Sequence, residues 1–191
     1  MKNIFLIIST IFGFSTFIIG IYSIIKGHFR PQRMTRFLLL LNSILFVGTL
    51  FAQGDRNAIY LALIYFLGSL VIFILSLKTG IGGTTKLDVT ILFMAIISLI
   101  VWYTTKNPVL GLVMSIVTDI ISVYPTIIKA WILPETEEWR CYLTEVLASS
   151  FNILSLSVFT FGKIVYPLYI WIINAVIVLI IVLRQKQLKH K

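Results

Sequence analysis

The chain has 191 residues and a formal net charge of +9, with 59% hydrophobic and only 12% charged residues. A soluble domain carries roughly 25% charged residues, and the mean hydropathy here is +1.01. This composition excludes an ordinary soluble domain. It predicts an all-α integral membrane protein that forms a single membrane domain over residues 1–191, with the lipid bilayer as its surroundings.

Seven apolar segments follow one another, each near the roughly 20 residues that a membrane-spanning helix needs. Seven transmembrane helices are therefore predicted, at about 3–25, 34–52, 58–77, 87–104, 107–131, 139–159 and 165–183. Lys163 is placed in a short turn before the last helix, and the residues from Arg184 onward form a basic tail.

The positive charge is explained by topology. With the N-terminus outside, twelve of the 16 lysines and arginines lie on the inner side and four on the outer side. The positive-inside rule then predicts a multi-pass protein of the plasma membrane with its N-terminus outside and its C-terminus cytoplasmic. Binding of anionic lipid by the basic segment 26–36 is the less favoured alternative, and no nucleic-acid partner is expected.

The residues for common chemistries are scarce. Cys141 is the one cysteine, and both histidines, His28 and His190, lie in basic flanking segments. These residues provide neither a metal motif nor a buried catalytic base. We therefore expect no enzyme activity, no metal and no cofactor.

The chain repeats itself after 103 residues, where Ile24-Ile25-Lys26 with Pro31 reappears as Ile127-Ile128-Lys129 with Pro134. Scarce polar positions coincide at the same distance: Thr16 with Asp119, Ser23 with Thr126, Asn42 with Glu145, and Thr49 with Asn152. The repeat predicts two parallel three-helix units, residues 1–78 and 107–191, joined by a linker helix at 86–105. This 3+1+3 arrangement is typical of transporters whose site lies between the halves.

The fifth segment carries a polar face. The residues on it recur at steps of three and four: Ser115, Asp119, Ser122, Thr126 and Lys129. On a helix they share one side, which must face protein or a water-filled cavity rather than lipid. An acid at mid-depth is by default a functional hypothesis. Asp119 is predicted to bind a solute or a proton, and a structural hydrogen bond to a neighbouring helix is the alternative.

The stretch Ser122-x-x-Pro125-Thr126-x-x-Lys129 resembles the PQ-loop motif, in which glutamine usually follows the proline. Together with the 3+1+3 count, it resembles the SWEET (MtN3) and PQ-loop superfamily of seven-helix transporters. That resemblance implies alternating-access transport of small solutes, or solute recognition as a sorting receptor. In the first half Tyr22 stands at the motif proline, and Val71 stands where sugar carriers have a pocket asparagine.

Further polar residues have two interpretations each. Glu145 and Asn152 are predicted near a central cavity, although Glu145 could instead be interfacial and paired with Lys129 or Arg140. Asn174 and Trp171 could contact a solute or pack helices together. Pro125 is interpreted as a gating hinge, against a static kink.

The predicted function is a carrier for a small polar or cationic solute, whose identity the sequence does not give. The solute would bind near Asp119, Glu145, Asn42 and Asn174 as two halves rock about Pro125, and proton coupling stays open. The alternatives are a solute-binding or sorting receptor of the same fold, or a membrane assembly factor. Homo-oligomerisation is also left open.

Overall fold

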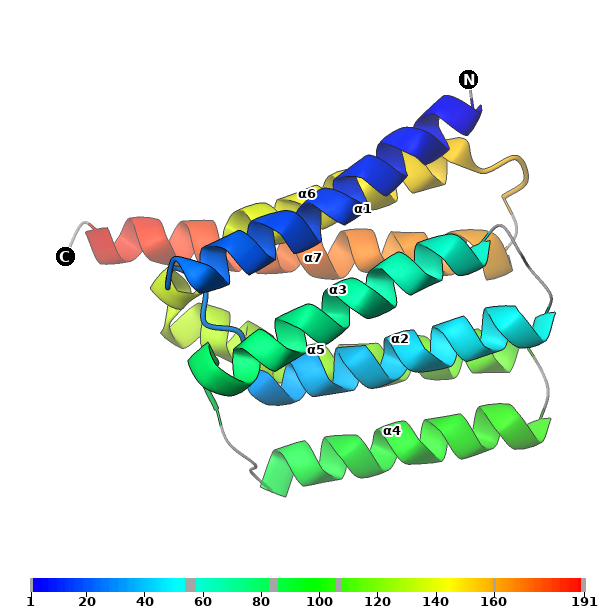
Figure 1. The fold of residues 1–191 in the computed structure, drawn as a ribbon, viewed down its shortest axis with the longest axis horizontal. Helices are drawn as coiled ribbons and strands as arrows, with labels where there is room; N and C mark the ends of the chain where they lie inside the picture. Colours follow the sequence, from blue (N-terminus) through cyan, green and yellow to red (C-terminus); the bar gives the residue numbers. More distant parts are fainter. Residues whose placement is uncertain (1, 54–57, 83–85, 106–107, 160, 190–191) are drawn as a thin grey trace. The chain divides into compact units, whose positions relative to one another are not determined.

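A computed structural model describes residues 2–53, 58–82, 86–105, 108–159 and 161–189 (Figure 1). Every regular element in these ranges is helical, and seven are α-helices. Their bounds are α1 Lys2–Ile25, α2 Arg33–Gln53, α3 Ala58–Thr79, α4 Lys86–Thr105, α5 Pro108–Ile132, the short 3₁₀ helix η1 Pro134–Thr136, α6 Trp139–Ser155 and α7 Phe161–Lys189. The predicted all-α fold is confirmed.

Two helix ends differ from the prediction. Helix α6 ends at Ser155 rather than near Phe159, because Leu156 is extended and its amide bonds back to Ile153 O. Helix α7 begins at Phe161, so Lys163 lies in its first turn and not in a loop. The predicted basic tail continues α7 to Lys189.

A glycine explains why α1 and α5 end differently. Gly27 has a φ of 77°, which glycine adopts without steric cost. The amide of Gly27 bonds to Ile24 O and that of His28 to Ser23 O, which closes the helix in a Schellman motif. The residue 103 positions later is Ala130, and there the helix continues to Ile132, just before Pro134.

Contacts divide the chain into two compact units: unit 1 contains Met1–Arg30 and Ile127–Lys191, and unit 2 contains Pro31–Thr126. Unit 1 therefore holds α1, α6 and α7, while unit 2 holds α2, α3, α4 and most of α5. This division places α1 with α6 and α7 rather than with α2 and α3. The predicted relation between residues 1–78 and 107–191 as repeats stays a prediction.

In unit 1, α1 packs against α6 through small residues. Ser9, Gly13, Gly20 and Ser23 are buried along one face of α1. Small side chains let two helix backbones approach closely, and Ser9 Oγ donates to Ala148 O of α6 at 2.8 Å. Beside this contact, the rings of Phe12 and Phe151 stack with centroids 5.8 Å apart. Helix α6 in turn contacts α7.

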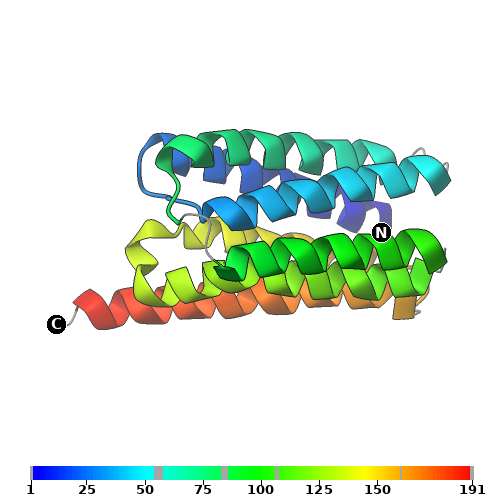
Figure 2. The same ribbon diagram turned by 90° about the horizontal axis from the view of Figure 1, so that it is seen from below.

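In unit 2, α2 and α3 lie side by side in both views (Figures 1 and 2). Leu38 of α2 is 1% exposed. The partly buried residues packed around it come from three helices: Met34, Leu41, Leu92 and Ile121. The amide of Ile81, just after α3, donates to Pro31 O at 3.0 Å. Gly80 permits this approach, because a Cβ there would lie 2.7 Å from Pro31 O.

Candidate functional site

The polar face of α5 is buried, as its spacing predicts. Asp119 is 8% exposed, Ser122 0%, Thr126 3% and Lys129 7%. The side chain of Ser115 lies outside the described residues. The unit boundary crosses this face between Thr126 and Ile127, one residue after Pro125. The polar face is therefore considered in two parts, one within each unit.

Within unit 2, two predicted site residues are in contact. Asn42 Nδ2 of α2 donates a hydrogen bond to Asp119 Oδ1 of α5 at 3.1 Å. A carboxylate supplies only acceptors, whereas the carboxamide supplies both donors and an acceptor. The pair thus combines negative charge with an orienting amide, which suits an ammonium group, a metal cation or a proton.

A further buried polar group lies on α5, next to Asp119 in the sequence. The hydroxyl of Thr118, 6% exposed, has no hydrogen-bond partner among the described residues. Ser122 Oγ uses the carbonyl of Thr118 instead, at 2.7 Å. An unsatisfied buried hydroxyl costs about 1–3 kcal/mol, and such a group at a functional site is available to a ligand. The sequence analysis did not select Thr118.

Thr35 is a second residue that sequence reasoning missed. Its hydroxyl donates to Ser122 O at 2.9 Å and accepts from Thr126 Oγ1 at 3.1 Å. Pro125 removes one helix hydrogen bond and crowds the preceding turn. The carbonyl left without its helix donor is that of Ile121, four residues before Pro125, whereas Thr35 binds the next carbonyl, that of Ser122. Thr35 therefore fixes α5 at its proline, and the only sequence signal was its position 103 residues before Glu138.

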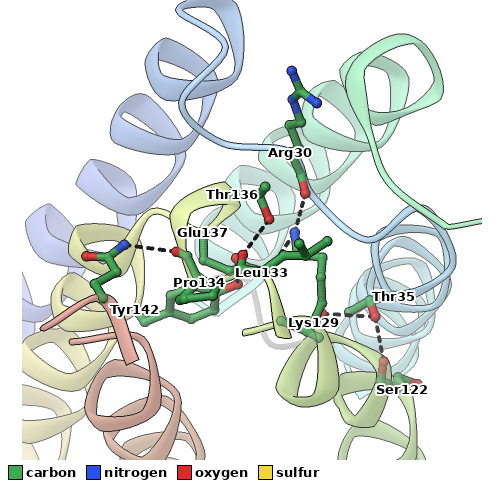
Figure 3. A network of polar contacts seen from close by, with 11 residues as sticks. Arg30, Thr35, Ser122, Lys129, Leu133, Pro134, Thr136, Glu137 and Tyr142 are labelled. Atoms are coloured by element: carbon green, nitrogen blue, oxygen red, sulfur yellow. Dashed lines mark hydrogen bonds and ion pairs between the residues drawn. The ribbon is translucent and has the colours of Figure 1, made fainter. Parts of the chain in front are cut away.

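Within unit 1, Lys129 takes part in a buried network (Figure 3). Its ammonium lies 2.7 Å from Glu137 Oε1, with both side chains buried. It also donates to Arg30 O and lies 5.6 Å from the centre of the Phe29 ring. Tyr142 Oη donates to Glu137 Oε2 at 2.8 Å. Lys129 thus joins the end of α5 to the segment after α1 and to the segment before α6.

Glu138, next to this ion pair, connects α1 with α6. Ser23 Oγ donates to Glu138 Oε2 at 2.8 Å, and the other carboxylate oxygen accepts from the amide of Arg140. Glu138 therefore caps the N-terminus of α6, where the helix dipole favours a negative charge. Neither Glu137 nor Glu138 was selected from the sequence, because both lie in a short polar turn that resembles a surface loop.

The remaining predicted solute-binding residues lie in unit 1. Trp171 Nε1 donates to Ser150 Oγ at 3.0 Å and is 39% exposed. Asn174 Nδ2 donates to Ile170 O of its own helix at 2.8 Å. Glu145 and Asn152 are partly buried on α6. Trp171 thus makes a contact between α7 and α6, whereas Asn174 bonds within its own helix.

Two helices whose residues are fully described are long and apolar enough to cross a membrane: Lys2–Ile25 and Ile164–Leu188. Only 28% and 17% of their most apolar windows are buried. The core helix of a soluble protein would be mostly buried, so these two helices present apolar surface outward. Within the described residues, no three His, Cys, Asp or Glu side chains form a group that could hold a metal ion.

No protein family matches the chain, and no curated protein and no solved structure is significantly similar to it.

Proposed function

We propose that this protein is a multi-pass membrane carrier for a small cationic or polar solute, with Asp119 and Asn42 as the centre of its binding site. The observation that carries the proposal is the hydrogen bond between buried Asp119 and partly buried Asn42. An ionisable group inside a membrane helix is costly, so its presence there is by default a hypothesis of function.

The proposal takes all seven α-helices as membrane spans. Six of them have 20 to 29 residues, and at 1.5 Å per residue each is long enough for a hydrocarbon core of roughly 30 Å. Helix α6 has 17 residues, at the short end of the range. The 3+1+3 arrangement of the PQ-loop and SWEET superfamily, with the N-terminus outside, is part of this proposal.

Reporter fusions test this topology. A fusion after Arg30 and one after Lys189 are expected to read cytoplasmic, and one within the segment 156–159 is expected to read external. A cytoplasmic signal from 156–159 would contradict seven spans.

Solute binding is tested on purified protein in detergent by thermal shift. The ligand panel contains arginine, lysine, choline, sodium and potassium ions, with neutral sugars for comparison. We expect saturable stabilisation by one class of cation, and its loss in Asp119→Asn, which keeps the shape of the side chain but removes its charge. Glu135→Gln, at an exposed acid, is the matched control. Failure of every cation to give an Asp119-dependent shift would overturn the proposed site.

Measuring solute uptake distinguishes a carrier from a solute-binding receptor. Protein in liposomes should take up the cation found by thermal shift, and the Asp119→Asn protein should not. Saturable binding without flux would support a solute-binding or sorting receptor of the same fold instead.

A further inference from the structure

The helix bounds follow the distance of 103 residues found in the sequence. This shift places the start of α3, Ala58, on the start of α7, Phe161. It also places α2, Arg33–Gln53, on α6, Trp139–Ser155, to within three residues at each end. By the same shift α1 corresponds to α5. The corresponding sets of helices are therefore α1, α2, α3 and α5, α6, α7.

The compact units do not coincide with these sets. Unit 1 combines α1 with α6 and α7, and unit 2 combines most of α5 with α2 and α3. Each unit thus contains the first helix of one set and the second and third helices of the other. Helix α4, without a counterpart, belongs to unit 2.

A hydrogen bond in unit 1 and a hydrogen bond in unit 2 join residue pairs that correspond to each other under the shift of 103 positions. In unit 1, Ser23 of α1 donates to Glu138 before α6. In unit 2, Thr126 of α5 donates to Thr35 of α2. Thr126 follows Ser23 by 103 positions, and Glu138 follows Thr35 by the same number. The first helix of each set therefore meets the second helix of the other set at the same place.

Two further contacts correspond to within one residue. The hydroxyls of Thr16 and Thr144 bond at 2.8 Å in unit 1, where unit 2 has Asp119 and Asn42. Pro134 O accepts from Gln185 of α7 at 2.9 Å. Its counterpart Pro31 O accepts from Ile81, at the end of α3. The contacts of Ser23 and Thr16, with their counterparts at Thr126 and Asp119, involve an exchanged first helix. Each proline contact joins residues of one repeat.

We propose that the two three-helix repeats of this chain have exchanged their first helices, so that each compact unit is one copy of the same three-helix arrangement built from both repeats. The chain passes between the units at Arg30–Pro31 and, next to Pro125, at Thr126–Ile127. A conformational change of the protein would then move compact units rather than sequence repeats. This exchange does not depend on the identity of a solute or on transport.

The test uses the full-length protein with Cys141 replaced by serine and a protease site inserted between α4 and α5. Cysteine pairs are introduced at two exchanged contacts, Thr16→Cys with Thr144→Cys and Thr35→Cys with Thr126→Cys. The protein is oxidised in membranes, and then cleaved. Because each pair joins the two cleavage fragments, we expect the cleaved protein to keep the mobility of the whole chain until it is reduced.

Two control pairs lie inside one fragment each: Phe37→Cys with Phe73→Cys across α2 and α3, and Ser150→Cys with Trp171→Cys across α6 and α7. These proteins should separate into two fragments after cleavage even without reduction. The proposal is overturned if the exchanged pairs do not cross-link while the control pairs do. It is also overturned if the exchanged pairs give a band of twice the mass, since the first helix would then come from a second copy.

Discussion

The two compact units are built alike but carry their charges at different places. Near the junction of the first and second helices, unit 1 has the carboxylate of Glu138 on Ser23, whereas unit 2 has a threonine pair, Thr126 with Thr35. Half-way along the helices it is unit 2 that carries the acid. Asp119 lies there at the position that corresponds to Thr16 of unit 1. The same arrangement of three helices thus holds its acid at a helix end in unit 1, where the acid joins α1 to α6. In unit 2 it holds its acid in the middle, where we propose that a solute binds.

The buried ion pair of unit 1 has no corresponding ion pair, because the positions corresponding to Lys129 and Glu137 are Lys26, which is exposed, and Met34. Removing one partner of a buried ion pair leaves an uncompensated charge. Substitutions that remove a buried charge should therefore lower the stability of unit 1 more than that of unit 2.

The largest effect is expected for Glu137→Gln, which leaves the Lys129 ammonium buried without its counter-charge. We expect a loss of about 3–5 kcal/mol in the stability of unit 1. The buried thiol of Cys141 reports it through faster labelling in mild detergent. Glu135→Gln should leave the labelling rate unchanged. The double variant Lys129→Met with Glu137→Leu should recover much of the stability, and a double variant as labile as the single one would contradict this interpretation.

The next largest effect is expected at the middle of the helices, where Asp119 of unit 2 corresponds to Thr16 of unit 1. Asp119→Leu leaves the Asn42 amide without its acceptor, and we expect a loss of about 1–3 kcal/mol in thermal stability. Thr16→Val in unit 1 should cost less than about 1 kcal/mol, because Thr144 keeps its bonds to the carbonyls of Arg140 and Cys141. Equal melting temperatures for the two variants would show that the acid–amide pair does not stabilise unit 2.

A smaller difference is expected at the corresponding hydroxyl contacts. Ser23→Ala removes a donor to a carboxylate and should cost about 1.5–3 kcal/mol, while Thr126→Val removes a neutral hydrogen bond and should cost about 0.5–1.5 kcal/mol. Melting temperatures in the same detergent compare the two. A larger loss for Thr126→Val would indicate that the turn around Pro125, rather than charge, dominates at this position.

The smallest effect is expected for Trp171→Phe, which removes one hydrogen bond from a partly exposed indole. We expect a loss of about 0.5–1 kcal/mol and no change in cation binding, because the proposed site lies in unit 2. A thermal-shift titration of Trp171→Phe beside Asp119→Asn measures both. A loss of affinity in Trp171→Phe as large as that in Asp119→Asn would require residues of unit 1 in the site.

Helix positions were predicted well because they depend on local properties. The length of each apolar segment, Pro108 at the start of α5 and the pattern of polar residues on α5 can all be read from neighbouring residues. The end of α6 was wrong because a short apolar stretch after Ser155 does not reveal that the backbone turns extended there. Lys163 was placed in a turn before the last helix, whereas it lies in the first turn of α7.

The sequence by itself determined the helical class, the order of the helices, the buried face of α5 and the candidate importance of Asp119, since hydrophobicity and spacing along one helix are sufficient for these. Only the tertiary structure decided the partners. Asn42 bonds to Asp119, Glu137 pairs with Lys129, and α1 packs with α6. Each of these contacts joins residues from different helices or segments, and the 103-residue repeat is compatible with either exchanged or unexchanged first helices. The choice depends on which helix faces fit together, because packing is a property of two surfaces and not of either sequence alone.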